Sequence, residues 1–91
     1  MPGVIIFKTN EPKHYYGYIF PDQPTYRTAK HDIRGNKDEI LWKKGNVSLE
    51  QARNAEETMN SLVKKLNDND EVNLESELAK VADFFPCEES N

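Results

Sequence analysis

Four aromatic rings lie within the nine residues His14-Tyr15-Tyr16-Gly17-Tyr18-Ile19-Phe20-Pro21-Asp22. Successive side chains of a strand alternate between the two faces of its sheet, so Tyr16, Tyr18 and Phe20 share one face. A row of rings on a sheet can stack unpaired nucleobases, and each stack contributes roughly 1–3 kcal/mol. It can equally be one half of a small core, because aromatic residues are good strand formers. The stretch therefore predicts a strand and leaves two interpretations of its rings open.

Two further strands are predicted around this one. Val4–Phe7 is β-branched and aromatic and runs into turn residues, while Glu39–Trp42 is a short apolar run that ends at two lysines and a glycine. The polar segment between Asp22 and Asp38 contains a proline and a glycine, and it predicts a long loop. The first half of the chain is thus expected to be a three-stranded antiparallel sheet.

The second half has helical periodicity. Ser48 followed by Gln51 forms the pattern of a capping box, which predicts the start of a helix of about 19 residues. Asn73 is placed to cap a second helix, and Pro86 is placed to stop it. The apolar stripes of the two helices are Ala52, Ala55, Met59, Leu62, Val63 and Leu66, then Leu74, Leu78, Val81, Ala82 and Phe85.

These elements predict one α+β domain over residues 1–91. Residues 1–47 form the sheet, residues 48–86 form two amphipathic helices, and residues 87–91 form a tail. The chain is 36% hydrophobic and 31% charged, so the core is thin, and we expect a marginal monomer or a homodimer that completes the sheet. With no apolar run of membrane-spanning length, no secretory leader and the single Cys87, we expect a cytoplasmic protein that does not enter membranes.

The net charge of −4 is distributed unevenly. Residues 1–47 carry eight Lys or Arg and five Asp or Glu, a balance of +3, whereas residues 48–91 carry four and eleven, a balance of −7. Phosphate binding depends on the local potential, so the first half can attract nucleic acid while the second half repels it.

Residues 3–47 resemble the cold-shock domains. The second strand of that family reads Lys-Gly-Phe-Gly-Phe-Ile followed by Pro-Asp, and His14–Asp22 is similar in its aromatic, glycine, isoleucine and Pro-Asp positions. The family's third strand, Asp-Val-Phe-Val-His, is matched by Asp38–Trp42, and its first strand, Gly-x-Val-Lys-Trp-Phe, by Gly3–Lys8. The fourth and fifth strands of the family are replaced here by the two helices.

This resemblance implies an OB-type sheet that binds single-stranded RNA or DNA on its aromatic face, with basic residues near the nucleic-acid backbone. The expected binding residues are Phe7, Lys8, Lys13, His14, Tyr16, Tyr18, Phe20, Trp42, Lys43 and Lys44.

The packing of the helices decides whether that face is free. If the ring row faces solvent, the helices pack on the other face of the sheet. In the opposite arrangement the rings lie beneath Leu62, Leu66, Leu78 and Phe85. A tyrosine hydroxyl needs a hydrogen-bond partner when it is buried, which favours exposure.

The sequence does not predict an enzyme, a metal site or a cofactor. His14 and His31 have no Cys or Glu at zinc-ligand spacing, and Asp68–Glu71 lacks the glycine and the later glutamate of a calcium loop. Two functions remain. The first is binding of single-stranded nucleic acid, with the helices as a scaffold, a dimer surface or a protein contact. The alternative is a non-catalytic regulatory or protein–protein interaction module whose acidic helices meet a basic partner.

Overall fold

The computed structural model describes residues 1–68 and 71–85. Along the chain the elements are β1 (Gly3–Asn10), β2 (Lys13–Phe20), α1 (Gln23–Gly35), β3 (Glu39–Lys44), α2 (Leu49–Asn67) and α3 (Leu74–Ala82). The α+β class, the three-stranded antiparallel sheet and the two helices that follow it are confirmed.

The sheet has the strand order β2-β1-β3, and β1 pairs antiparallel with both neighbours. Tyr18 lies opposite Ile5 on one side of β1. On the other side, Ile6 lies opposite Trp42 and Phe7 opposite Ile40, so Leu41 is an extra residue in β3. This β-bulge shifts the alternation of β3 side chains relative to the rest of the sheet.

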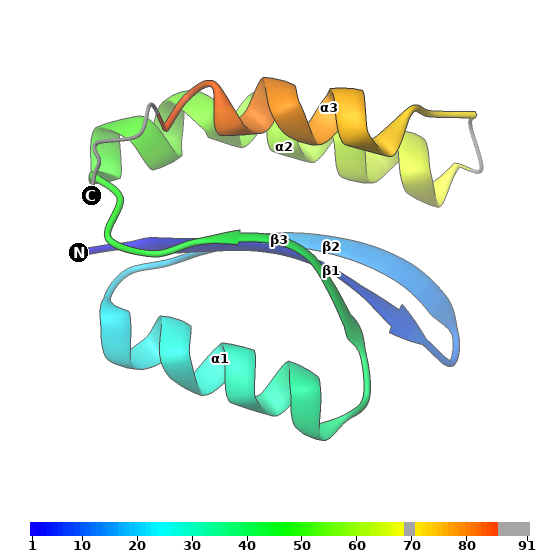
Figure 1. Cartoon of the computed structure of the whole chain (residues 1–91), viewed down its shortest axis with the longest axis horizontal. Helices are drawn as coiled ribbons and strands as arrows, with labels where there is room; N and C mark the ends of the chain where they lie inside the picture. Colours follow the sequence, from blue (N-terminus) through cyan, green and yellow to red (C-terminus); the bar gives the residue numbers. More distant parts are fainter. Residues whose placement is uncertain (69–70, 86–91) are drawn as a thin grey trace.

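Helices cover both faces of the sheet, in three layers (Figure 1). α2 and α3 lie side by side on one face, and α1 lies on the other. Each face has its own buried cluster, because the alternate residues of β1 point in opposite directions: Val4 and Ile6 toward α2 and α3, Ile5 and Phe7 toward α1. The two predicted C-terminal helices therefore pack on only one side of the sheet.

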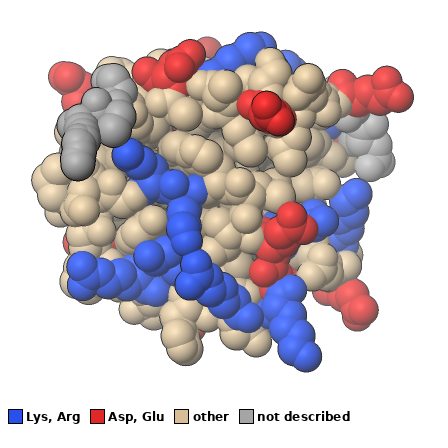
Figure 2. Space-filling model, viewed as in Figure 1, with Lys and Arg blue, Asp and Glu red and all other residues tan. Residues whose placement is uncertain are grey.

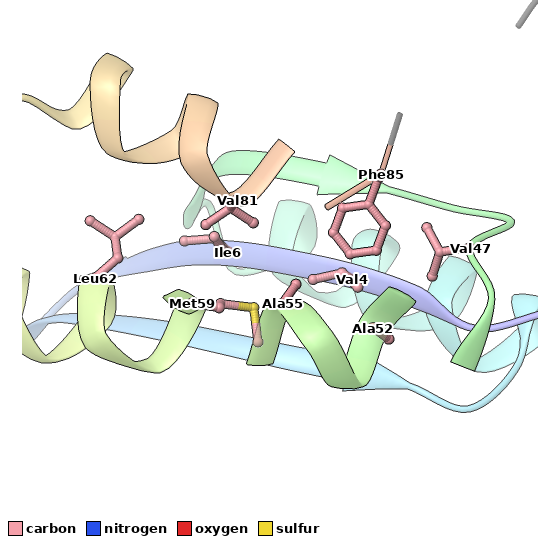
Figure 3. Packing of buried hydrophobic residues seen from close by; sticks show 9 residues of the cluster. All are labelled: Val4, Ile6, Val47, Ala52, Ala55, Met59, Leu62, Val81 and Phe85. Atoms are coloured by element: carbon pink, nitrogen blue, oxygen red, sulfur yellow. The ribbon is translucent and has the colours of Figure 1, made fainter. Parts of the chain in front are cut away.

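The larger core lies between the sheet and the pair α2–α3 (Figure 3). Val4 and Ile6 of β1 meet Met59 and Leu62 of α2 and Val81 of α3, and all five side chains are almost fully buried. The apolar stripe predicted for α2 is the face that it buries, and Ser48 with Gln51 forms the predicted capping box. Asn73 caps α3 as predicted, whereas Pro86 lies outside the described residues.

The prediction of a long loop over residues 22–38 is wrong, because most of this segment is α1. The Asp22 carboxylate accepts a hydrogen bond from the Thr25 N–H at 2.8 Å, which caps the helix and lowers the pKa of that carboxyl. Pro24 lies in the first turn, where its missing N–H removes no helical hydrogen bond. Tyr26 and Ile33 are buried against Ile5 and Phe7.

Among the described residues, no helix has both the length and the apolar content that crossing a bilayer requires.

Candidate functional site

The predicted ring row forms on the α1 face of the sheet. Its rings follow β2 in order, with centroid separations of 4.7 Å from His14 to Tyr16, 5.9 Å from Tyr16 to Tyr18 and 6.2 Å from Tyr18 to Phe20. Phe7 of β1 lies beside the row, 5.2 Å from Tyr16 in a stacked arrangement. We call His14, Tyr16, Tyr18 and Phe20 the ring row.

The ring row is partly free. Tyr18 is 48% exposed and His14 is exposed, while Tyr16 and Phe20 are half-buried. Phe7 is only 9% exposed, because α1 lies over β1 at this point, so this predicted binding residue is a support beneath the rings rather than a surface group. The ring row does not lie under Leu62 and Phe85, since those side chains belong to the opposite face.

Trp42 is separated from the ring row. It lies opposite Ile6, and its ring contacts that of Phe85 with a centroid separation of 5.7 Å. Residues opposite each other in a sheet share a face, so Trp42 is on the side of α2 and α3. The expectation of one platform containing Phe7, Tyr16, Tyr18 and Trp42 is therefore wrong in its geometry.

The predicted basic residues are separated as well. Lys8 forms an ion pair with Glu39 at 3.2 Å, and the Lys13 ammonium lies 5.7 Å from the centre of the Tyr15 ring. Lys44 lies opposite Val4 and so points toward the α2 side. Lys43 lies opposite Ile5 and is on the α1 side, but at the β3 edge of the sheet, whereas the ring row is on β2.

A second basic group was missed because residues 22–38 were predicted to be a loop. Helical spacing places Arg27, Lys30 and Arg34 along one flank of α1. Arg34 lines a cavity of about 570 Å³ together with Asp38 and the β3 residues Glu39 to Lys43, so this flank faces β3. The spacing of three and four residues was the signal that could have identified it.

The edge of the molecule at β3 consequently carries several cations, although Asp38 and Glu39 also line the cavity there. Figure 2 is viewed from the side on which β3 lies in front of β1 and β2, and it shows Lys and Arg side chains gathered over β3 and α1. The ring row and these cations thus occupy opposite flanks of α1. Within the part of the chain that the structure describes, no cluster of His, Cys, Asp or Glu is arranged to hold a metal ion.

Comparisons with protein-family models, with curated proteins and with solved structures found no match for this chain. The resemblance to cold-shock domains therefore stays a prediction.

Proposed function

We propose that this protein is a non-catalytic module that binds another protein through the ring row. The single observation that supports this most is Tyr18, which is 48% exposed between the half-buried rings of Tyr16 and Phe20. Tyrosine and phenylalanine are enriched at the centres of protein interfaces, where they bury much surface and lose few side-chain torsions. Phe7 beneath the row restricts these rings before any partner arrives.

The charges around the ring row favour a protein over a nucleic acid. The residues of β1 and β2 on this face carry neither Lys nor Arg; they are Gly3, Ile5, Phe7, Thr9, His14, Tyr16, Tyr18 and Phe20. The flank of α1 away from β3 carries Thr25, Ala29 and Asp32. Nucleic-acid binding draws much of its affinity from cations beside the phosphates, and here the cations lie on the other flank of α1.

Binding of single-stranded RNA or DNA at the ring row is the second candidate. The planes of the Tyr16 and Tyr18 rings lie within 20° of parallel, with their centroids 5.9 Å apart. Each of these rings offers a face or an edge to an unpaired base, which supports stacking of a short strand. The binding surface is then His14, Tyr16, Tyr18 and Phe20 without the other predicted residues. For either function we place the protein in the cytoplasm, since its one cysteine has no internal partner.

A photo-crosslinking amino acid distinguishes the two candidates. It is introduced in place of Tyr18 and, as the matched control, in place of Leu49 on α2, which is 50% exposed and far from β2 in sequence. We expect a protein cross-link at position 18 that is absent at position 49 in cells that express the chain. A nucleic-acid cross-link at position 18 would support the second candidate instead. If neither position forms a specific cross-link, both functions of the ring row are wrong.

The purified protein gives an independent check of the second candidate. A fluorescent pyrimidine oligonucleotide is titrated with the wild type and with Tyr18→Ala, at low and then at high salt. Stacking predicts tight binding at low salt that Tyr18→Ala abolishes, whereas the protein-binding proposal predicts no effect of this substitution on oligonucleotide binding. Circular dichroism is used to check that the variant is folded.

A further inference from the structure

The outer edge of β3 has no strand beside it in the described part of the chain. The sheet order is β2-β1-β3, so β3 pairs with β1 on one side only. Within residues 1–68 and 71–85, no hydrogen bond from a segment other than β1 reaches the backbone of residues 39–44. The outer edge of β2 differs, because the Asn67 side chain bonds both backbone groups of Tyr15. An edge with unbonded N–H and C=O groups is a template for another strand.

A cavity follows this edge along most of the strand. It has a volume of about 570 Å³, and its lining includes every β3 residue from Glu39 to Lys43. The floor is partly apolar, since Leu41 and Trp42 are only half-buried by the larger core. An extended backbone laid in this cavity would lie beside β3.

The two sides of the cavity differ chemically. On the α1 side, Arg34 and Lys43 line it, and Arg27 and Lys30 continue the basic flank of α1. Two acidic residues, Asp38 and Glu39, also line the cavity at the start of β3. Glu39 forms an ion pair with Lys8, so among these charges Asp38 is opposed by Arg34, Lys43 and the two further cations of α1. On the side of α2 and α3, the lining is the Leu41 and Trp42 side chains, which the β-bulge places on the same face.

We propose that β3 accepts an extended segment of a partner protein as a fourth strand, and that acidic and apolar residues alternate in this segment. Strand alternation would direct the acidic side chains toward Arg34 and Lys43 and the apolar ones toward Leu41 and Trp42. Main-chain hydrogen bonds supply affinity, and the two sides of the cavity supply specificity. The site is separate from the ring row, so the two proposals fail or succeed independently.

A second copy of the chain paired about Leu41 fits this edge poorly. In a two-fold antiparallel pair centred on Leu41, Ile40 of one copy would oppose Trp42 of the other. Opposed residues must share a face, but Ile40 packs on the α1 side and Trp42 on the α2 side because of the bulge. The pairing would also bring the two basic flanks of α1 to the same edge. A partner strand of opposite charge avoids the repulsion between the two basic flanks, and a segment of different sequence does not have to place Ile40 opposite Trp42.

The test uses a fluorescent peptide of alternating glutamate and valine, about six residues long to match the length of β3. Anisotropy reports binding to the full-length protein, and Trp42 emission reports occupation of the cavity. We expect saturable binding that changes Trp42 emission and weakens with salt. Arg34→Glu/Lys43→Glu should weaken it at least about tenfold, because charges at the rim of a site are reversed.

Two controls separate strand addition from charge alone. Arg53→Glu/Lys64→Glu makes the same change of net charge at exposed positions of α2 and should leave peptide binding unchanged. A peptide N-methylated at alternate residues keeps its charge but loses backbone donors, and it should bind about tenfold more weakly if β3 accepts a strand. Equal binding of both peptides would overturn the proposal.

Nucleic acid is the competing occupant of this basic edge. An oligothymidine tests this alternative. The edge would be assigned to phosphates, and the proposal overturned, if the oligothymidine displaced the peptide, bound more tightly than the peptide, and bound more weakly to the same Arg34→Glu/Lys43→Glu variant. Failure of the peptide to bind folded wild-type protein would overturn it as well. Neither result bears on cross-linking at Tyr18.

Discussion

The side-chain amide of Asn67 forms two hydrogen bonds with the backbone of Tyr15. Its Oδ1 accepts from the Tyr15 N–H at 2.8 Å, and its Nδ2 donates to the Tyr15 carbonyl at 3.0 Å. The last residue of α2 thereby occupies the place that a neighbouring strand would take beside β2. One sheet edge is closed in this way at Tyr15, whereas no described residue closes the edge at β3.

Asn67→Ala should destabilise the fold. Tyr15 is half-buried, and the substitution leaves its N–H and C=O without their partner, which costs about 1–3 kcal/mol in the free energy of unfolding. Urea denaturation followed by circular dichroism measures the change. Asn60→Ala, at an exposed position of the same helix, is the matched control and should cost less than about 0.5 kcal/mol. Equal midpoints for the two variants would contradict the bridging role of Asn67.

Gly3 and Gly35 should respond oppositely to alanine. A Cβ at Gly3 would collide with the Tyr26 ring, which is buried, so Gly3→Ala must displace α1 and should cost about 1–3 kcal/mol. A Cβ at Gly35 would meet nothing within 4 Å, and its backbone is not left-handed, so Gly35→Ala should stabilise by about 0.4–1 kcal/mol. Thermal unfolding of both variants tests the pair. If Gly3→Ala left the stability unchanged, α1 would lie farther from the sheet than the structure places it.

Alkaline pH should weaken the packing of α1. Burial raises the pKa of the Tyr26 phenol above its ordinary value of 10.0, and the charge of Arg34 acts in the opposite direction. Below the ordinary value of 10.0 the phenol is neutral in both the folded and the unfolded chain. Above it, the unfolded chain loses the proton first, so the free energy of unfolding falls as pH rises.

Urea denaturation at about pH 9 and about pH 11 tests this dependence. Tyr26→Phe removes the titrating hydroxyl and leaves all other titrating groups in place. Its free energy of unfolding should therefore fall less between these two pH values than that of the wild type. An identical loss in both proteins would show that Tyr26 does not contribute to the alkaline dependence.

Phe85→Ala should destabilise the larger core and expose the tryptophan. Phe85 is buried and contacts Trp42, so its truncation should cost about 3–5 kcal/mol and shift the Trp42 emission to the red. Phe84→Ala is the control, since Phe84 is only half-buried beside the same core. A red shift for Phe84→Ala without one for Phe85→Ala would contradict this packing.

Local sequence signals predicted most of the elements correctly. Alternation around Tyr16 and Tyr18 identified β2, and the capping pair Ser48–Gln51 with a stripe of period 3.6 identified α2. Each of these signals depends on residues that are close together in the sequence, so it can be recognised without the tertiary structure. α1 was missed because its apolar stripe, chiefly Tyr26 and Ile33, is short and set among polar residues, although Asp22 and Pro24 are helix-start residues.

The sequence by itself determined that β2 carries three rings on one face, because alternation is a property of every strand. Only the tertiary structure decided which rings are free: α1 buries Phe7, the bulge at Leu41 sends Trp42 to the opposite face, and Tyr18 is left half exposed. The same packing separated the cations of β3 and α1 from the ring row. Burial and charge clustering depend on contacts between segments distant in the chain, and local patterns do not specify these contacts.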